Sequence, residues 1–105
     1  MSPEDTGIEK DRVVRKTGRP EKLKKDLAQR LARIEGQVRG IARMVDGDVY
    51  CDDILNQVTA VHYALGAVRN ILLENHIHNC VLHSIENKEY EVINELMLTL
   101  KRMLK

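Results

Sequence analysis

The chain has 105 residues, of which 43% are hydrophobic and 31% charged, and its formal net charge is +1. This length and balance are typical of one globular domain, and they exclude a collagen, a disordered acidic tail and a multidomain enzyme. No apolar run approaches the roughly 18 residues of a membrane span, and the first residues lack a signal peptide's apolar stretch, so we expect a cytoplasmic protein without a membrane partner.

Charge is distributed unevenly along the chain. The first twenty residues are densely charged and nearly without apolar side chains, so residues 1–20 are predicted to be a flexible basic arm ahead of a helical domain at 21–105. Residues 10–43 hold 12 Lys and Arg against 4 Asp and Glu, whereas residues 44–105 hold 5 against 9. This polarity indicates a surface for a polyanion, or else a solvated charged face.

Beyond the arm, apolar residues recur at alternating spacings of four and three, which is the heptad repeat of a packed helix. One stripe predicts a helix over 21–45, which a left-handed Asp46-Gly47 step ends and after which Asp48 can cap the next helix. A second predicts a long helix over 49–85, and a shorter helix follows Asn87. No strand is predicted, so the fold class is all-α. The stripes comprise Leu27, Leu31, Ile34, Val38, Ile41 and Val45 in the first helix and Ile54, Val58, Val61, Leu65, Val68 and Leu72 in the second.

The length of the second helix predicts self-association. A helix of about 37 residues is about 55 Å long, more than a compact monomer of this size needs. Pairing with the first helix would leave part of its apolar stripe in water. We therefore expect two hairpins to form an antiparallel four-helix bundle, with the third helix joining such dimers into a homotetramer.

Cysteine and histidine spacing predicts a metal site between chains. In a reducing compartment the two cysteines are expected to be metal ligands or redox-active thiols rather than a disulfide. His76 and Cys80 are four residues apart and share one helical face, whereas Cys51 lies on that face about 37 Å away. A second, antiparallel copy brings Cys51 level with His76 and Cys80, which creates two intersubunit sites per dimer.

The donor types decide which metal is expected. Two thiolates and one imidazole suit Cu(I), or Zn(II) if His83 completes a tetrahedron. His62 is expected to be packed or solvated, and His78 to point elsewhere. A chance His/Cys pair and a buried apolar cysteine remain alternatives. Neither a C-x-x-C motif nor signs of an oxyanion pocket occur, so no enzyme is predicted.

The first predicted helix carries the candidate DNA-binding residues. Its non-heptad faces present side chains that can contact phosphates and base edges of double-stranded DNA, namely Arg30, Arg33, Gln37, Arg39 and Arg43. The lack of interleaved aromatic residues disfavours single-stranded nucleic acid, and no helix-turn-helix pattern is present. DNA is therefore expected to bind to a flank of the bundle.

Three strings of sequence carry a family resemblance. RLARIEGQVRGIARMVDGDVYCDDILNQV at 30–58, NHIHNC at 75–80 and INEL at 93–96 resemble the CsoR/RcnR family of bacterial transcriptional repressors, over roughly 25–104. The resemblance implies an all-helical, disc-shaped homotetramer that binds operator DNA when free of ligand and releases it when an inducer binds.

Within that family, Cys51, His76 and Cys80 match the Cu(I)-sensing branch. The resemblance thus implies a Cu(I)-responsive repressor of copper-resistance or efflux genes. Nickel and cobalt sensors place His where Cys80 stands, and formaldehyde sensors lack the second Cys. A persulfide-responsive repressor of the same family and a cytosolic copper-storage protein without a DNA role are the alternatives.

The resemblance also implies roles for residues around the metal and the DNA. Tyr50 and Glu95 would hydrogen-bond to the metal-bound histidine, with Glu91 as the fallback for Glu95. The positions at which the family places basic residues that influence DNA binding are Arg30, Arg33, Arg39 and Arg69.

Overall fold

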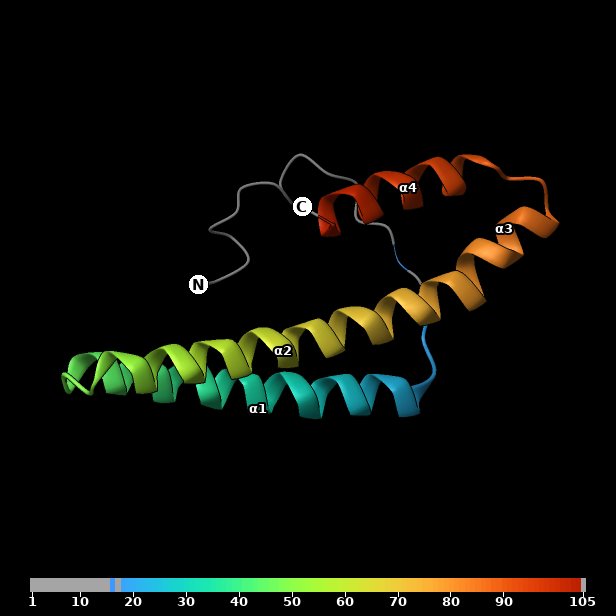
Figure 1. Cartoon of the computed structure of the whole chain (residues 1–105). Helices are drawn as coiled ribbons and strands as arrows, with labels where there is room; N and C mark the ends of the chain where they lie inside the picture. Colours follow the sequence, from blue (N-terminus) through green and yellow to red (C-terminus); the bar gives the residue numbers. More distant parts are fainter. Residues whose placement is uncertain (1–15, 17, 105) are drawn as a thin grey trace.

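The computed structural model describes residue 16 and residues 18–104, so the predicted arm at 1–20 lies almost entirely outside the described residues. The described chain is helical (Figure 1), with the segments α1 (Glu21–Asp46), α2 (Cys51–His76), the π-helical η3 (Ile77–Val81), α3 (Leu82–Glu86) and α4 (Glu91–Met103). This part of the chain contains no strand, which confirms the all-α class. None of the described helices is long and apolar enough to cross a lipid bilayer.

A tight turn joins α1 and α2 into an antiparallel hairpin (Figure 1). Gly47 N–H donates to the Arg43 carbonyl at 2.9 Å and ends α1, as the sequence predicts. The left-handed residue, however, is Asp48, with φ 55°, while Gly47 has φ −88°. Asp48 also does not cap the next helix, because α2 begins after Tyr50 and has no side-chain cap hydrogen bond.

The long helix predicted over 49–85 is present as one helical run from Cys51 to Glu86. The sequence does not predict its change of pitch: η3 is a π-helical turn between α2 and α3. The run ends at Glu86, and Asn87 and the left-handed Lys88, with φ 61°, follow it. Beyond this turn, α4 folds back over α2 (Figure 1). Figure 1 shows α2 between α1 on one side and α4 on the other.

Each heptad stripe is covered only in part in the hairpin, with three of six residues exposed in the first stripe and two of six in the second. The hairpin core consists of buried Leu27, Ile34, Val61 and Val68. The alternating stripe residues remain exposed, with exposed fractions of 46% for Leu31, 49% for Val38, 59% for Val45 and 46% for both Val58 and Leu65. The hairpin thus leaves apolar side chains of both helices exposed, and for the second helix the sequence predicts this.

Candidate metal site and nucleic-acid interface

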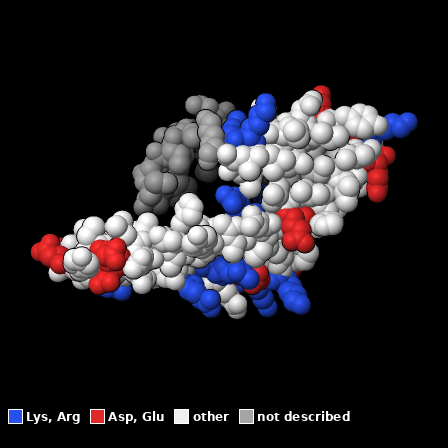
Figure 2. All heavy atoms as spheres, in the orientation of Figure 1, with Lys and Arg blue, Asp and Glu red and all other residues white. Residues whose placement is uncertain are grey.

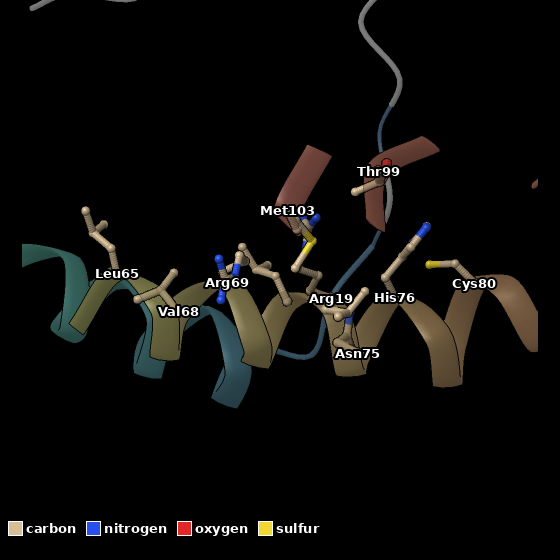
Figure 3. A pocket seen from close by; sticks show the side chains of 11 residues that line it. Arg19, Leu65, Val68, Arg69, Asn75, His76, Cys80, Thr99 and Met103 are labelled. Carbon is tan, nitrogen blue, oxygen red and sulfur yellow. The ribbon is translucent and has the colours of Figure 1, made fainter. Parts of the chain in front are cut away.

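His76 and Cys80 lie one helical turn apart where α2 becomes η3. His76 is the last residue of α2, and Cys80 lies within the π-helical turn. Both side chains are half-buried, and both project from the same side of the helix toward α4 (Figure 3). A soft sulfur and an imidazole nitrogen therefore face the same space, as their spacing predicts.

That space is a groove of about 470 Å³ between α2 and α4. His76 and Cys80 line one wall, while Thr99 and Met103 of α4 line the other (Figure 3). The groove is large enough for a small ligand, and it leaves the two donors open on the side away from α1. The π-helical turn therefore presents its donors to an accessible groove and not to the hairpin core.

A side-chain hydrogen bond spans the same turn. The amide of Asn79 donates to the Asn75 side-chain oxygen at 2.6 Å. These two residues line another groove, beside the start of α1, together with the exposed His78. His78 thus points away from His76 and Cys80, in agreement with the sequence prediction.

Cys51 lies at the opposite end of α2. It is the first residue of that helix and is exposed, with a free thiol. At the rise of an α-helix, the 25 residues that separate it from His76 span about 37 Å. No group of three His, Cys, Asp or Glu side chains among the described residues is arranged to hold a metal ion. One protomer therefore brings together only two of the three predicted ligands.

The remaining histidines are engaged elsewhere. His83 is exposed, and its Nε2 lies 3.0 Å from the side-chain nitrogen of Asn87. His62 is exposed in the middle of α2, where its ring packs edge-on against Tyr63 with 6.3 Å between ring centroids. Neither ring is brought to His76 and Cys80 within the protomer.

The two residues predicted to support the metal-bound histidine lie on different elements. Tyr50 directly precedes α2, whose last residue is His76, so the length of that helix separates the two within one chain, and Tyr50 is 74% exposed. Glu95 is exposed on α4, the helix that faces His76 across the groove, and Glu91 is the first residue of that helix. Their predicted hydrogen bonds to the metal-bound histidine remain predictions.

Basic side chains gather along α1. Figure 2 shows them on the side of the hairpin formed by that helix, whereas acidic groups lie at the α1–α2 turn. Arg30 pairs with Asp26 at 3.1 Å and Arg39 with Glu35 at 2.9 Å. Such exposed pairs contribute little free energy, about 0–1 kcal/mol, so they do not prevent these arginines from contacting phosphate.

Two candidate DNA-binding residues lie away from this face. Gln37 is half-buried, and its side-chain oxygen is buried without a hydrogen-bond partner among the described residues. Arg69 is on α2, where it lines the groove that contains His76 and Cys80. The sequence placed Gln37 with the arginines of the first helix because helical periodicity does not show which neighbouring helix covers each face, whereas Arg69 was named only through the family resemblance.

Sequence reasoning also missed the α4 side of the groove. Thr99 and Met103 are four residues apart and therefore share one face of α4. The helical spacing of this segment was visible, but nothing in it indicated that this face would lie opposite His76. The π-helical turn likewise had no sequence signal.

Comparison with known proteins gives consistent results. A family model described as metal-sensitive transcriptional repressor matches residues 23–102. The copper-sensing transcriptional repressor CsoR of Bacillus subtilis is 47% identical over 85 residues, which are 80% of this chain and 84% of that protein. The copper-sensing transcriptional repressor RicR of Mycobacterium tuberculosis is 50% identical over 62 residues, 59% of this chain and 65% of that protein.

A solved structure has the same fold. The copper-sensing repressor CsoR with Cu(I) from Geobacillus thermodenitrificans matches with a TM-score of 0.81 and 40% sequence identity. The match covers 86% of this chain and 95% of that one.

Proposed function

Because the chain belongs to the family of metal-sensitive transcriptional repressors, we propose that it is a Cu(I)-responsive repressor. It binds double-stranded operator DNA in the metal-free form and leaves it when Cu(I) binds, which derepresses copper-resistance or efflux genes. Members of this family are transcriptional repressors, so the chain is not an enzyme.

The pair of soft donors in the α2–α4 groove carries the proposal. Cys80 offers a thiol and His76 an imidazole on one side of one helical turn, and both are half-buried. Cu(I) accepts few ligands and prefers sulfur and imidazole, so this donor set fits it. The relatives named as copper-sensing and the solved Cu(I) structure support the same choice of metal.

The third donor of the proposed site is Cys51 of a partner subunit. The exposed stripe residues, among them Val58 and Leu65 on α2, supply an apolar surface on which a second hairpin can pack. An antiparallel partner would bring its Cys51 level with His76 and Cys80, and the two-fold axis would create the second site. Tyr50 would reach His76 in the same way, from the partner chain.

The exposed face of α4 supports assembly of two such dimers. Met97, Leu98 and Leu104 are more than half exposed on or directly after this helix. Their burial between dimers would give the proposed homotetramer, with the arginine-rich faces of α1 on its outer surface.

The proposed coupling between the two functions acts through α2 and α4. Cys51 of one chain and His76 and Cys80 of the other would hold Cu(I), which would supply a link between the two chains. His76 and Cys80 would hold the metal from the groove wall, and Glu95 would accept a hydrogen bond from the second imidazole N–H of His76 and so tie α4 to the site. If the free energy of DNA binding differs by about 1–3 kcal/mol between the metal-free and the Cu(I)-bound protein, Cu(I) lowers DNA affinity about 5- to 150-fold.

An anaerobic titration of Cu(I) into the protein bound to labelled promoter DNA tests this proposal. Fluorescence anisotropy should fall on addition of Cu(I), while Zn(II), Ni(II) and a persulfide donor leave the complex intact. Cys51→Ala should bind DNA as the unaltered protein does but should not release it. Release by persulfide alone, or release of the Cys51→Ala variant by Cu(I), would contradict the proposal.

A further inference from the structure

We infer that Met103 of α4 forms, with His76 and Cys80 of the same chain, a capture site that holds Cu(I) before Cys51 of the partner subunit binds it. This inference rests on the proposed copper function and adds a ligand and an order of binding to it. Its basis is that one groove contains three soft donor side chains of a single protomer, from two helices.

The geometry places the three side chains around one space. His76, Cys80 and Met103 all line the groove of about 470 Å³ between α2 and α4. All three are half-buried. Figure 3 shows the thioether of Met103 pointing from α4 toward α2, the His76 side chain projecting from the end of α2 toward α4, and the Cys80 thiol beside His76 on the same side of the helix. The thioether thus faces the same groove as the thiol and the imidazole.

The chemistry of the thioether suits a transient ligand. Soft thioethers select Cu(I), and being uncharged they lose no proton when they bind. Methionine has three rotatable side-chain bonds, so its sulfur can move within a groove at low cost. The helix that carries Met103 has no fully buried residue, so a small movement of α4 toward α2 breaks little packing.

The other methionine of α4 offers a direct contrast. Met97 is 52% exposed and is not among the residues that line the groove. The two residues have the same chemistry and lie on the same helix, but only one faces His76 and Cys80. Position in the groove, and not the presence of methionine on α4, therefore defines the inferred ligand.

The order of binding follows from the location of Cys51. Its thiol is exposed and about 37 Å along the helix from His76 of its own chain, so among the described residues the second sulfur that lines the groove with the pair is that of Met103. When Cys51 of the partner subunit arrives, its sulfur forms a bond to copper and the bond from the Met103 thioether breaks. The thiol proton of Cys51 passes to solvent, and copper remains Cu(I) because no electron is transferred.

The capture site can be isolated by removing Cys51 from the full chain. We would compare Cys51→Ala with the double variants Cys51→Ala/Met103→Leu and Cys51→Ala/Met97→Leu. Cu(I) affinity is measured anaerobically by competition with the chromophoric chelator bathocuproine disulfonate. The Met103→Leu double variant should bind Cu(I) at least about tenfold more weakly than Cys51→Ala, and the Met97→Leu double variant should match Cys51→Ala.

Selenomethionine labelling provides a readout that packing alone does not change. X-ray absorption of Cu(I)-loaded, labelled Cys51→Ala should show a Cu–Se scattering shell that disappears in the Met103→Leu double variant and persists in the Met97→Leu one. Leucine is close to methionine in volume, and thermal unfolding followed by circular dichroism verifies that each variant is folded.

Two results would overturn the inference. These are equal Cu(I) affinities for the two double variants, or no Cu–Se shell in labelled Cys51→Ala. Either would leave Met103 as a packing residue only. Failure of the proposed function would be seen separately, as DNA that stays bound to the unaltered protein when Cu(I) is added.

Discussion

The two faces of α2, one toward α1 and one toward α4, differ in how firmly they are packed. Against α1, this helix buries Val61 and Val68 in a core with Leu27 and Ile34. On the face toward α4, that helix contributes no buried residue, and the space between α2 and α4 is an open groove. The first region is a support with a fixed shape, whereas the second can change its contacts when a ligand binds. Sensing needs such a region, because a ligand shifts a protein only between forms that differ little in free energy.

The largest expected effect is the loss of stability when a side chain is removed from the α1–α2 core, compared with a removal from α4. Ile34→Ala should lower the free energy of unfolding by about 2–4 kcal/mol, because Ile34 is buried and its removal leaves a cavity. Leu100 on α4 is only half-buried, so Leu100→Ala should lower the free energy of unfolding by about 1 kcal/mol. Urea unfolding followed by circular dichroism measures both. Equal losses of unfolding free energy for the two variants would show that α4 is packed as firmly as the α1–α2 core.

Two variants with opposite expected effects should separate the DNA-binding face of α1 from the metal donors in the α2–α4 groove. Arg33→Gln, on the exposed face of α1, should weaken DNA binding and reduce the slope of log affinity against log salt by about 1, while Cu(I) affinity stays unchanged. His76→Ala should have the opposite pattern, with intact DNA binding and impaired Cu(I) binding. Anisotropy over a salt series and chelator competition measure the two affinities.

Lys88→Gln is the matched control for the lost positive charge. It removes an exposed cation from the turn before α4, far along the sequence from α1. Its salt slope should equal that of the unaltered protein. A Lys88→Gln effect as large as that of Arg33→Gln would mean that net charge, and not the face of α1, governs DNA binding.

The smallest expected effect concerns an exposed ion pair on α1. Glu35→Gln removes the partner of Arg39 and should change the free energy of unfolding by only about 0.3–0.5 kcal/mol. The released Arg39 and the loss of one negative charge should strengthen DNA binding slightly, most clearly at low salt. Weaker DNA binding by this variant would show that the pair holds Arg39 in its binding orientation.

The packed face of α2, toward α1, was largely predictable from the sequence, and the open face, toward α4, was not. Heptad spacing locates Leu27, Ile34, Val61 and Val68 because burial along a helix follows a fixed period. Together with the length of the second helix, it also predicts that part of that helix's stripe stays uncovered in the hairpin. The same period says nothing about which helix lies opposite His76, so the α4 wall of the groove had to come from tertiary structure.

Local backbone details were harder still. The π-helical turn at Ile77–Val81 and the left-handed conformation of Asp48 depend on which backbone hydrogen bonds form locally, and composition does not predict these. The Asp46-Gly47 pair indicated where α1 ends but not which residue takes the positive φ. The ligand triad is the intermediate case, since spacing places His76 and Cys80 together but needs a second chain to include Cys51.

Mixed dimers test most directly whether the metal site lies between two chains. Cys51→Ala and Cys80→Ala chains, each with a different affinity tag, would be refolded together, and the mixed species purified. One chain then keeps His76 and Cys80 while the other keeps Cys51, so mixed dimers should regain about half of the tight Cu(I) binding of the unaltered dimer. Cu(I) binding in the mixed dimers no tighter than in either variant alone would contradict a site shared between chains.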